Sequence, residues 1–197
     1  MLWRIHAASA LLVVPQATVG TFALVFLVDS HGWAPSTAGR VLAAGQVGGA
    51  VARGVAGWWS DRARARVRPM RLVALTITGV VALLAVSTHS AVALAALLAA
   101  GVLTVSPNGL AFTAVAEHAG QSWAGRALGI QNTVQNLAAI ATTPAMATVI
   151  AASGYGAAFA ATIAFPLAAA VVIPVSADRG ADISPSPRPS RRRVTAR

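Results

Sequence analysis

Six long apolar segments, separated by short polar ones, run through this chain of 197 residues. A helix needs about 20 predominantly apolar residues to cross the hydrocarbon core of a bilayer. Segments that approach or exceed this length lie at about 5–28, 37–59, 72–87, 91–115, 127–152 and 157–175. Only 10% of the residues are charged, which is too few to cover a water-soluble fold. The sequence therefore predicts an all-α membrane protein with six transmembrane helices.

The arginines lie at alternate ends of these segments. Thirteen of the fifteen fall before the first segment, between the second and third, between the fourth and fifth, or after the sixth. The other two, Arg40 and Arg53, lie inside the second segment. Because cytoplasmic loops carry an excess of basic residues, we expect both termini on the cytoplasmic side of the cell membrane. This placement explains the net charge of +10, so nucleic acid is not an expected partner.

The two ends of the chain need separate interpretations. The apolar run after His6 continues to Val28, which exceeds the 7–15 residues or so of a signal-peptide core. A retained first helix is therefore favoured over a cleaved leader. At 184–190 proline alternates with serine and arginine, a pattern that cannot continue a helix and has nothing to bury. We predict a six-helix bundle at 1–176 and a disordered, basic cytoplasmic tail at 177–197.

Two short patterns recur at corresponding places in the first and last three segments. A helix-breaking proline precedes a carboxamide at 15–16 and again at 107–108, with an offset of 92 residues. The second and fifth segments both open on Ala-Gly-Arg, at 38–40 and 124–126. Since three helices reverse the chain, the second set is expected to be inverted, as in secondary transporters. Chance matching in a chain rich in Ala, Gly and Arg is the alternative.

Polar side chains within the apolar segments are candidates for a solute pathway, because at membrane depth they usually face the bundle interior. Gln131 and Gln135 lie on one face of the fifth segment, and Gln46 and Arg53 share a face of the second. Hydrogen bonding between helices is the alternative role for the amides. For Arg53 the alternative is extension towards the cytoplasmic interface. An inward-facing Arg53 would hold an anionic solute or a carboxylate partner. It favours anions as the substrate class, with small hydrophobic molecules as the alternative.

Sequence patterns of enzymes are absent from this chain. It has no nucleophile elbow, no lysine-containing phosphate loop and no His-Glu-x-x-His zinc motif. Cysteine is also absent, and no acidic residue lies deep within an apolar segment. We therefore expect neither an enzyme nor a bound metal or cofactor.

The loop after the second segment carries a more specific pattern. Gly57, Ser60, Asp61 and Arg62, followed by further arginines, resemble the cytoplasmic loop motif of the major facilitator superfamily. The second half is also similar to this family, with Glu117 at the end of the fourth segment, Gly-Arg-Ala-Leu-Gly at 125–129 and Gly-Tyr at 154–155. The resemblance covers about 3–175 and corresponds to helices seven to twelve of a twelve-helix transporter.

This resemblance implies one bundle of an alternating-access permease for a small solute in the bacterial inner membrane. In this family the first and fourth helices of each bundle line the cavity, which implies positions for Gln16 and Asn108 beside the solute. It also implies that Asp61 and Arg62 act in conformational switching against an opposite bundle. That bundle is absent from this sequence, so three alternatives stay open: a homodimer, pairing with a missing N-terminal half, and a truncated, non-transporting fragment or assembly partner.

Overall fold

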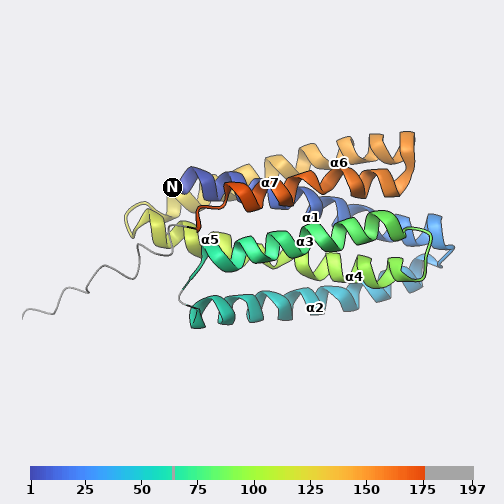
Figure 1. Cartoon of the computed structure of the whole chain (residues 1–197), viewed down its shortest axis with the longest axis horizontal. Helices are drawn as coiled ribbons and strands as arrows, with labels where there is room; N and C mark the ends of the chain where they lie inside the picture. Colours follow the sequence, from blue (N-terminus) through green and yellow to red (C-terminus); the bar gives the residue numbers. More distant parts are fainter. Residues whose placement is uncertain (64, 176–197) are drawn as a thin grey trace, which may run out of the picture.

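The computed structural model describes residues 1–63 and 65–175. Arg64 and the tail predicted at 177–197 lie outside these residues. Within the described residues the chain forms helices that lie roughly along one common axis (Figure 1). They are α1 (Leu2–His31), α2 (Pro35–Arg62), α3 (Val67–Ser87), α4 (Val92–Val105), α5 (Pro107–Ala119), α6 (Ala124–Thr162) and α7 (Ala164–Val172).

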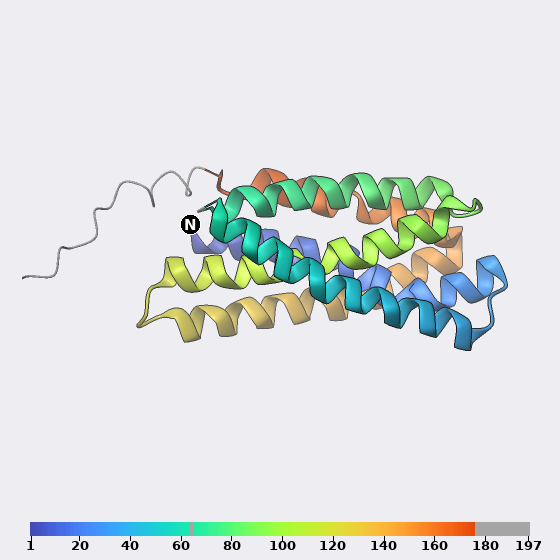
Figure 2. The same cartoon turned by 90° about the horizontal axis from the view of Figure 1, so that it is seen from below.

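The chain passes back and forth along the bundle (Figures 1 and 2). The N-terminus, the α2–α3 connection, the α5–α6 connection and the end of α7 lie together at one end. We call this end, which carries Arg4, Arg66 and Arg126, the arginine end. The opposite end, with Gly32, the turn at 88–91 and Gly154, is the far end.

Prolines and one glycine divide the helices differently from the predicted segments. The predicted segment at 91–115 is split into α4 and α5, because Pro107 has no N–H to donate to the carbonyl four residues earlier. The predicted segments at 127–152 and 157–175 remain separate, because α6 (Ala124–Thr162) consists of two helices that meet at Gly154. Gly154 interrupts α6 with φ 81° and ψ 176°, and the chain reverses there (Figure 1). Pro166 accounts for the boundary between α6 and α7 in the same way.

Within residues 1–63 and 65–175, four helical stretches are long and apolar enough to cross a membrane: Leu2–His31, Val67–Ser87, Val92–Ala119 and Ala124–Val172. The last contains 49 residues and holds the reversal at Gly154. Although α2 has 28 residues, it is not among them, since arginines, Gln46 and several glycines lower its apolar character. Helix length and apolarity therefore do not confirm the prediction of six membrane-spanning helices. They also do not test the predicted inverted repeat.

The apolar core lies where α1, α3, α4, α6 and α7 pack together. From α3 it receives Ile77, Val81 and Leu84, which are all fully buried. At the far end the ring of Phe26 meets those of Tyr155 and Phe159 edge-on, with centroids 5.3 and 5.5 Å away. The Tyr155 hydroxyl donates to Asp29 Oδ2 at 2.9 Å. These contacts hold the reversal of α6 against the end of α1.

Candidate functional site

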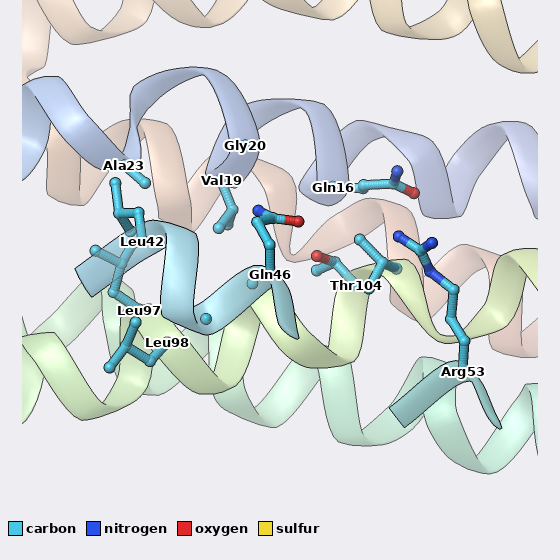
Figure 3. A pocket seen from close by; sticks show the side chains of 13 residues that line it. Gln16, Val19, Gly20, Ala23, Leu42, Gln46, Arg53, Leu97, Leu98 and Thr104 are labelled. Atoms are coloured by element: carbon cyan, nitrogen blue, oxygen red, sulfur yellow. The ribbon is translucent and has the colours of Figure 1, made fainter. Parts of the chain in front are cut away.

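A cavity of about 290 Å³ lies between α1, α2 and α4. Its polar wall consists of Gln16 from α1, Gln46 and Arg53 from α2, and Thr104 from α4. Figure 3 shows these four side chains pointing towards one another from the three helices. Apolar side chains, among them Leu42 and Leu97, line the end nearer the far end of the bundle. A few polar groups on an otherwise apolar wall are typical of small-molecule sites.

Glycines on α2 bring that helix close to α4 beside the cavity. A Cβ atom added at Gly45, Gly48 or Gly49 would lie 3.3, 3.2 or 3.1 Å from a side chain of α4. The spacing Gly45-x-x-x-Gly49 therefore allows close contact between α2 and α4. Because the glycines have no side chains, the polar groups that α2 extends along the cavity are Gln46 and Arg53.

Gln46 and Arg53 are exposed as well as lining the cavity. The described lining residues include no carboxylate, and Arg53 is the charged one among them. An arginine in such a position presents planar N–H donors to a carboxylate or phosphate group. The described wall of the cavity therefore carries one positive charge, a group of the kind that pairs with anions.

A chain of amides leads from the cavity into the bundle. Asn108 Nδ2, on α5, donates to Gln16 Oε1 at 3.1 Å. Gln135 Nε2, on α6, donates to Asn108 Oδ1 at 3.5 Å and also to Ser9 Oγ on α1. The chain thus joins three helices whose residues are far apart in sequence. It satisfies polar groups that would otherwise be costly to bury.

Gln131 lies one turn before Gln135 on α6 and is fully buried. Its Oε1 is within hydrogen-bond distance of His6 Nδ1, and its Nε2 has no partner among the described residues. The described wall of the cavity includes neither Gln131 nor Gln135. The polar side of α6 instead divides between these buried amides and the exposed Asn132 and Asn136.

The loop motif holds the arginine end together through Arg66. The guanidinium of Arg66 pairs with Asp61, donates to Ser60 Oγ at 3.0 Å and donates to Glu117 Oε1 at 3.0 Å. The hydrogen bond to Glu117 raises the pKa of Arg66, against the opposing effect of burial, so the group stays charged. Ser60 Oγ in turn donates to the Ala65 carbonyl at 2.7 Å. These contacts, which we call the Arg66 clamp, tie the α2–α3 connection to the end of α5.

The residues predicted for the site are therefore distributed over three places. The cavity wall holds Gln16, Gln46 and Arg53, the amide chain holds Asn108, Gln131 and Gln135, and the Arg66 clamp includes Ser60 and Asp61. Gly57 lies one turn before the clamp on α2, and Arg62 is exposed at the end of that helix. Sequence reasoning did not find Thr104, Ser9 or the pairing of His6. Spacing along the chain carries no signal for contacts 125 residues apart.

Comparison with known proteins agrees with this architecture. Residues 1–143 match the family model of the Major Facilitator Superfamily. The chain is 44% identical over 177 residues to uncharacterized MFS-type transporters from two strains of Mycobacterium tuberculosis. The match covers 89% of this chain and 40% of each relative, so the chain spans about two fifths of their length. This family consists of transporters rather than enzymes. The chain belongs to the major facilitator superfamily and is a multi-pass membrane protein.

Proposed function

We propose that this chain forms one six-helix bundle of a solute transporter that works by alternating access. The cavity between α1, α2 and α4 is the substrate site in this proposal. The observation that carries it is the convergence of Gln16, Gln46, Arg53 and Thr104 on one cavity from three helices (Figure 3). The volume of about 290 Å³ is at the lower end of the range for ligand pockets, about 300–1,000 Å³. A small solute fits such a space.

The amide contact at the cavity supports an inverted repeat in this bundle. Asn108 and Gln16 are 92 residues apart, which is the offset of the two proline–carboxamide pairs, and their side chains are hydrogen-bonded. Residues near a pseudo-two-fold axis meet their own counterparts. In the proposed repeat, α1 corresponds to α4 together with α5, and α2 corresponds to α6 up to Gly154. The α3 helix corresponds to the part of α6 after Gly154 together with α7. The cavity then lies at the repeat interface, where transporters bind substrate.

The exposed side of α2 supports a second bundle as the partner. Gln46 and Arg53 lie on a face that hydrocarbon would solvate poorly. A protein surface across the cavity, from another copy or from an N-terminal half, removes that cost and encloses the solute. The Arg66 clamp and the other described loop arginines lie at the same end as the N-terminus, which supports a cytoplasmic location for both termini.

The same exposed face favours a second candidate function, an assembly partner that does not itself transport. Such a bundle needs a surface for another bundle but no solute, and the cavity would then be only a gap between helices. Transport measurements separate the two functions, because they require solute to cross the membrane through the cavity.

The test is uptake into proteoliposomes that contain the full chain, alone and with the N-terminal half of a Mycobacterium tuberculosis relative. The probes are radiolabelled benzoate, inorganic phosphate and tetraphenylphosphonium. Because Arg53 is the charged residue of the described wall, we expect uptake of an anion and a loss of at least about tenfold in Arg53→Gln. Arg40→Gln, on the same helix but outside the described wall, is the matched control and should leave uptake unchanged. If neither preparation takes up any of the three probes, the transport function is contradicted and the assembly function is supported.

A further inference from the structure

A second, smaller cavity of about 180 Å³ lies at the far end of the bundle, where α1 connects to α2 and α3 connects to α4 (Figure 1). Its described wall consists of Leu27, His31, Trp33, Ser90, Ala91 and Leu94. None of these residues lines the cavity between α1, α2 and α4. The two cavities are neighbours, because Leu27 lies one turn after Ala23 on α1 and Leu94 lies one turn before Leu98 on α4.

Local backbone structure gives this wall its shape. Gly32 ends α1 with φ 66°, the left-handed conformation that glycine favours. The Trp33 N–H then donates to the Leu27 carbonyl at 3.2 Å, so the chain folds back over the end of α1. In the α3–α4 turn, Ser90 Oγ donates to the Ser87 carbonyl at 2.9 Å and accepts from the N–H two residues later at 3.3 Å. The Ser90 hydroxyl therefore has partners within its own turn.

The ring of His31 brings an unpartnered polar atom to this wall. Its Nε2 is buried and has no hydrogen-bond partner among the described residues. Ser87 Oγ and Gln131 Nε2 are also buried without a partner in the described chain, but neither residue lines either cavity. The His31 ring packs edge-on against Phe26, with centroids 5.1 Å apart. A buried polar atom without a partner is unfavourable, so it indicates a ligand with a hydrogen-bonding group.

The rest of the wall selects the chemical class of that ligand. Trp33 presents an indole, Leu27 and Leu94 present aliphatic side chains, and the described wall holds no carboxylate or arginine. Aromatic rings pack well edge-to-face or with an offset, whereas water gains nothing from such a surface. A hydroxyl group both donates and accepts, so it satisfies the imidazole nitrogen in either tautomer. The volume is below the range for ligand pockets, about 300–1,000 Å³, which limits the ligand to a single ring.

We propose that the far-end cavity is a second binding site, for a neutral aromatic alcohol with one ring, such as a phenol. The hydroxyl group pairs with His31 Nε2, and the ring packs against Trp33 and the two leucines. A bound molecule contacts the α1–α2 connection and the α3–α4 turn at the same time, and so holds them together. This inference goes beyond the proposed function, because binding at this site requires no transport.

The test is an NMR titration of the full chain in lipid nanodiscs with phenol, using isotope-labelled histidine and tryptophan. In the wild-type chain we expect the ring signals of His31 and the indole signal of Trp33 to shift and saturate together. Toluene has the ring without the hydroxyl group, so it should bind about 2- to 12-fold more weakly, the effect of one hydrogen bond. Tryptophans near the arginine end report partition of either probe into lipid: Trp3, Trp58, Trp59 and Trp123.

A pair of variants tests the role of the nitrogen. His31→Phe keeps an aromatic ring but removes Nε2, so phenol affinity read from Trp33 should fall by about 2- to 12-fold, while toluene affinity is unchanged. The matched control is His89→Phe, in the α3–α4 turn but outside the described wall, which should bind phenol as the wild type does.

Three results in the wild-type chain overturn the proposal, even if His31→Phe fails to fold. They are the absence of a saturating shift, a shift shared equally by the tryptophans near the arginine end, and equal affinities for phenol and toluene. Unchanged phenol affinity in folded His31→Phe overturns it as well, and so does an equal loss in His89→Phe. The uptake assay probes the other cavity, so its failure leaves these outcomes unaffected.

Discussion

The α2 and α3 helices are consecutive in the chain but pack in opposite ways. On α3, buried residues recur at intervals of three and four, from Met70 through Ala74, Ile77 and Val81 to Leu84, and none is more than 1% exposed. On α2, which is longer, the buried residues are all small: Ala38, Gly49, Ala56 and Ser60. The α3 helix contributes branched side chains such as Ile77, Val81 and Leu84 to the core. The α2 helix has only small residues at its buried positions, so its backbone lies close to α4.

This difference separates scaffold from site. In lipid the hydrophobic effect does not hold helices together, so van der Waals packing carries more of the association. A helix that buries only small side chains forms fewer such contacts and is easier to displace. The polar cavity residues Gln46 and Arg53 lie on this weakly packed helix. We infer that α3 fixes the bundle while α2 is free to move with its polar groups.

The largest effect should come from the packed stripe of α3. Replacing Ile77 with Ala removes three buried carbons from a fully buried position and leaves a cavity. We expect the free energy of unfolding to fall by about 2–5 kcal/mol. Unfolding in mixed micelles with increasing SDS measures it. Val86→Ala, on the same helix but 84% exposed, is the control and should change stability by less than about 0.5 kcal/mol. Equal losses in both variants would mean that α3 is not a scaffold.

A second, smaller effect is expected where α2 meets α4. In Gly49→Leu the new Cβ lies 3.1 Å from Val105 Cγ2, so the larger side chain must push the helices apart. Overpacking of this kind costs about 1–3 kcal/mol. The matched control is Gly54→Leu, on the same helix, where no atom lies within 4 Å of an added Cβ. The same unfolding assay applies. Should Gly49→Leu be as stable as Gly54→Leu, close backbone contact is not what holds α2.

The sequence predicted the helical membrane class because apolar length and arginine placement depend only on local composition. It also predicted Gln16, Gln46 and Arg53 as cavity residues, and the structure brings these three together. Pro107 was identified as a helix-breaking residue, but 91–115 was predicted as one segment, and the structure divides it into α4 and α5. A proline inside an apolar segment either kinks or divides a helix, and the outcome depends on packing around it.

The amide chain was the least predictable part of the site. Gln131 and Gln135 were identified as polar groups facing inward, but their partners Ser9 and His6 lie 126 and 125 residues away. Which residues of α1 meet them depends on the rotation and relative depth of two helices. Periodicity fixes which face of a helix is polar but does not fix either quantity. The Arg66 clamp had a local signal in the loop motif, yet the role of Glu117 depended on tertiary packing.

The Arg66 clamp should contribute less than either packing contact. Arg66→Gln removes the ion pairs with Asp61 and Glu117, whose side chains are 66% and 48% exposed. Exposed pairs contribute about 0.2–1 kcal/mol each, so we expect a stability loss of about 1 kcal/mol. The loss should shrink in high salt, because the charges are screened. Arg62→Gln changes the net charge equally and tests whether charge alone is responsible. A salt-independent loss, or one shared by Arg62→Gln, would contradict the clamp.

The smallest effect on stability is expected from the polar side of α2 itself. Gln46 is exposed beside the cavity, so Gln46→Leu should change the free energy of unfolding by less than about 0.5 kcal/mol. Its effect should instead appear in binding of radiolabelled benzoate by the full chain. Loss of one hydrogen bond, worth about 0.5–1.5 kcal/mol, weakens binding by about 2- to 12-fold. Val47→Leu, the adjacent residue outside the described wall, should change neither property. If Gln46→Leu instead stabilises the bundle strongly without affecting binding, this face of α2 meets lipid, and the division between scaffold and site must be abandoned.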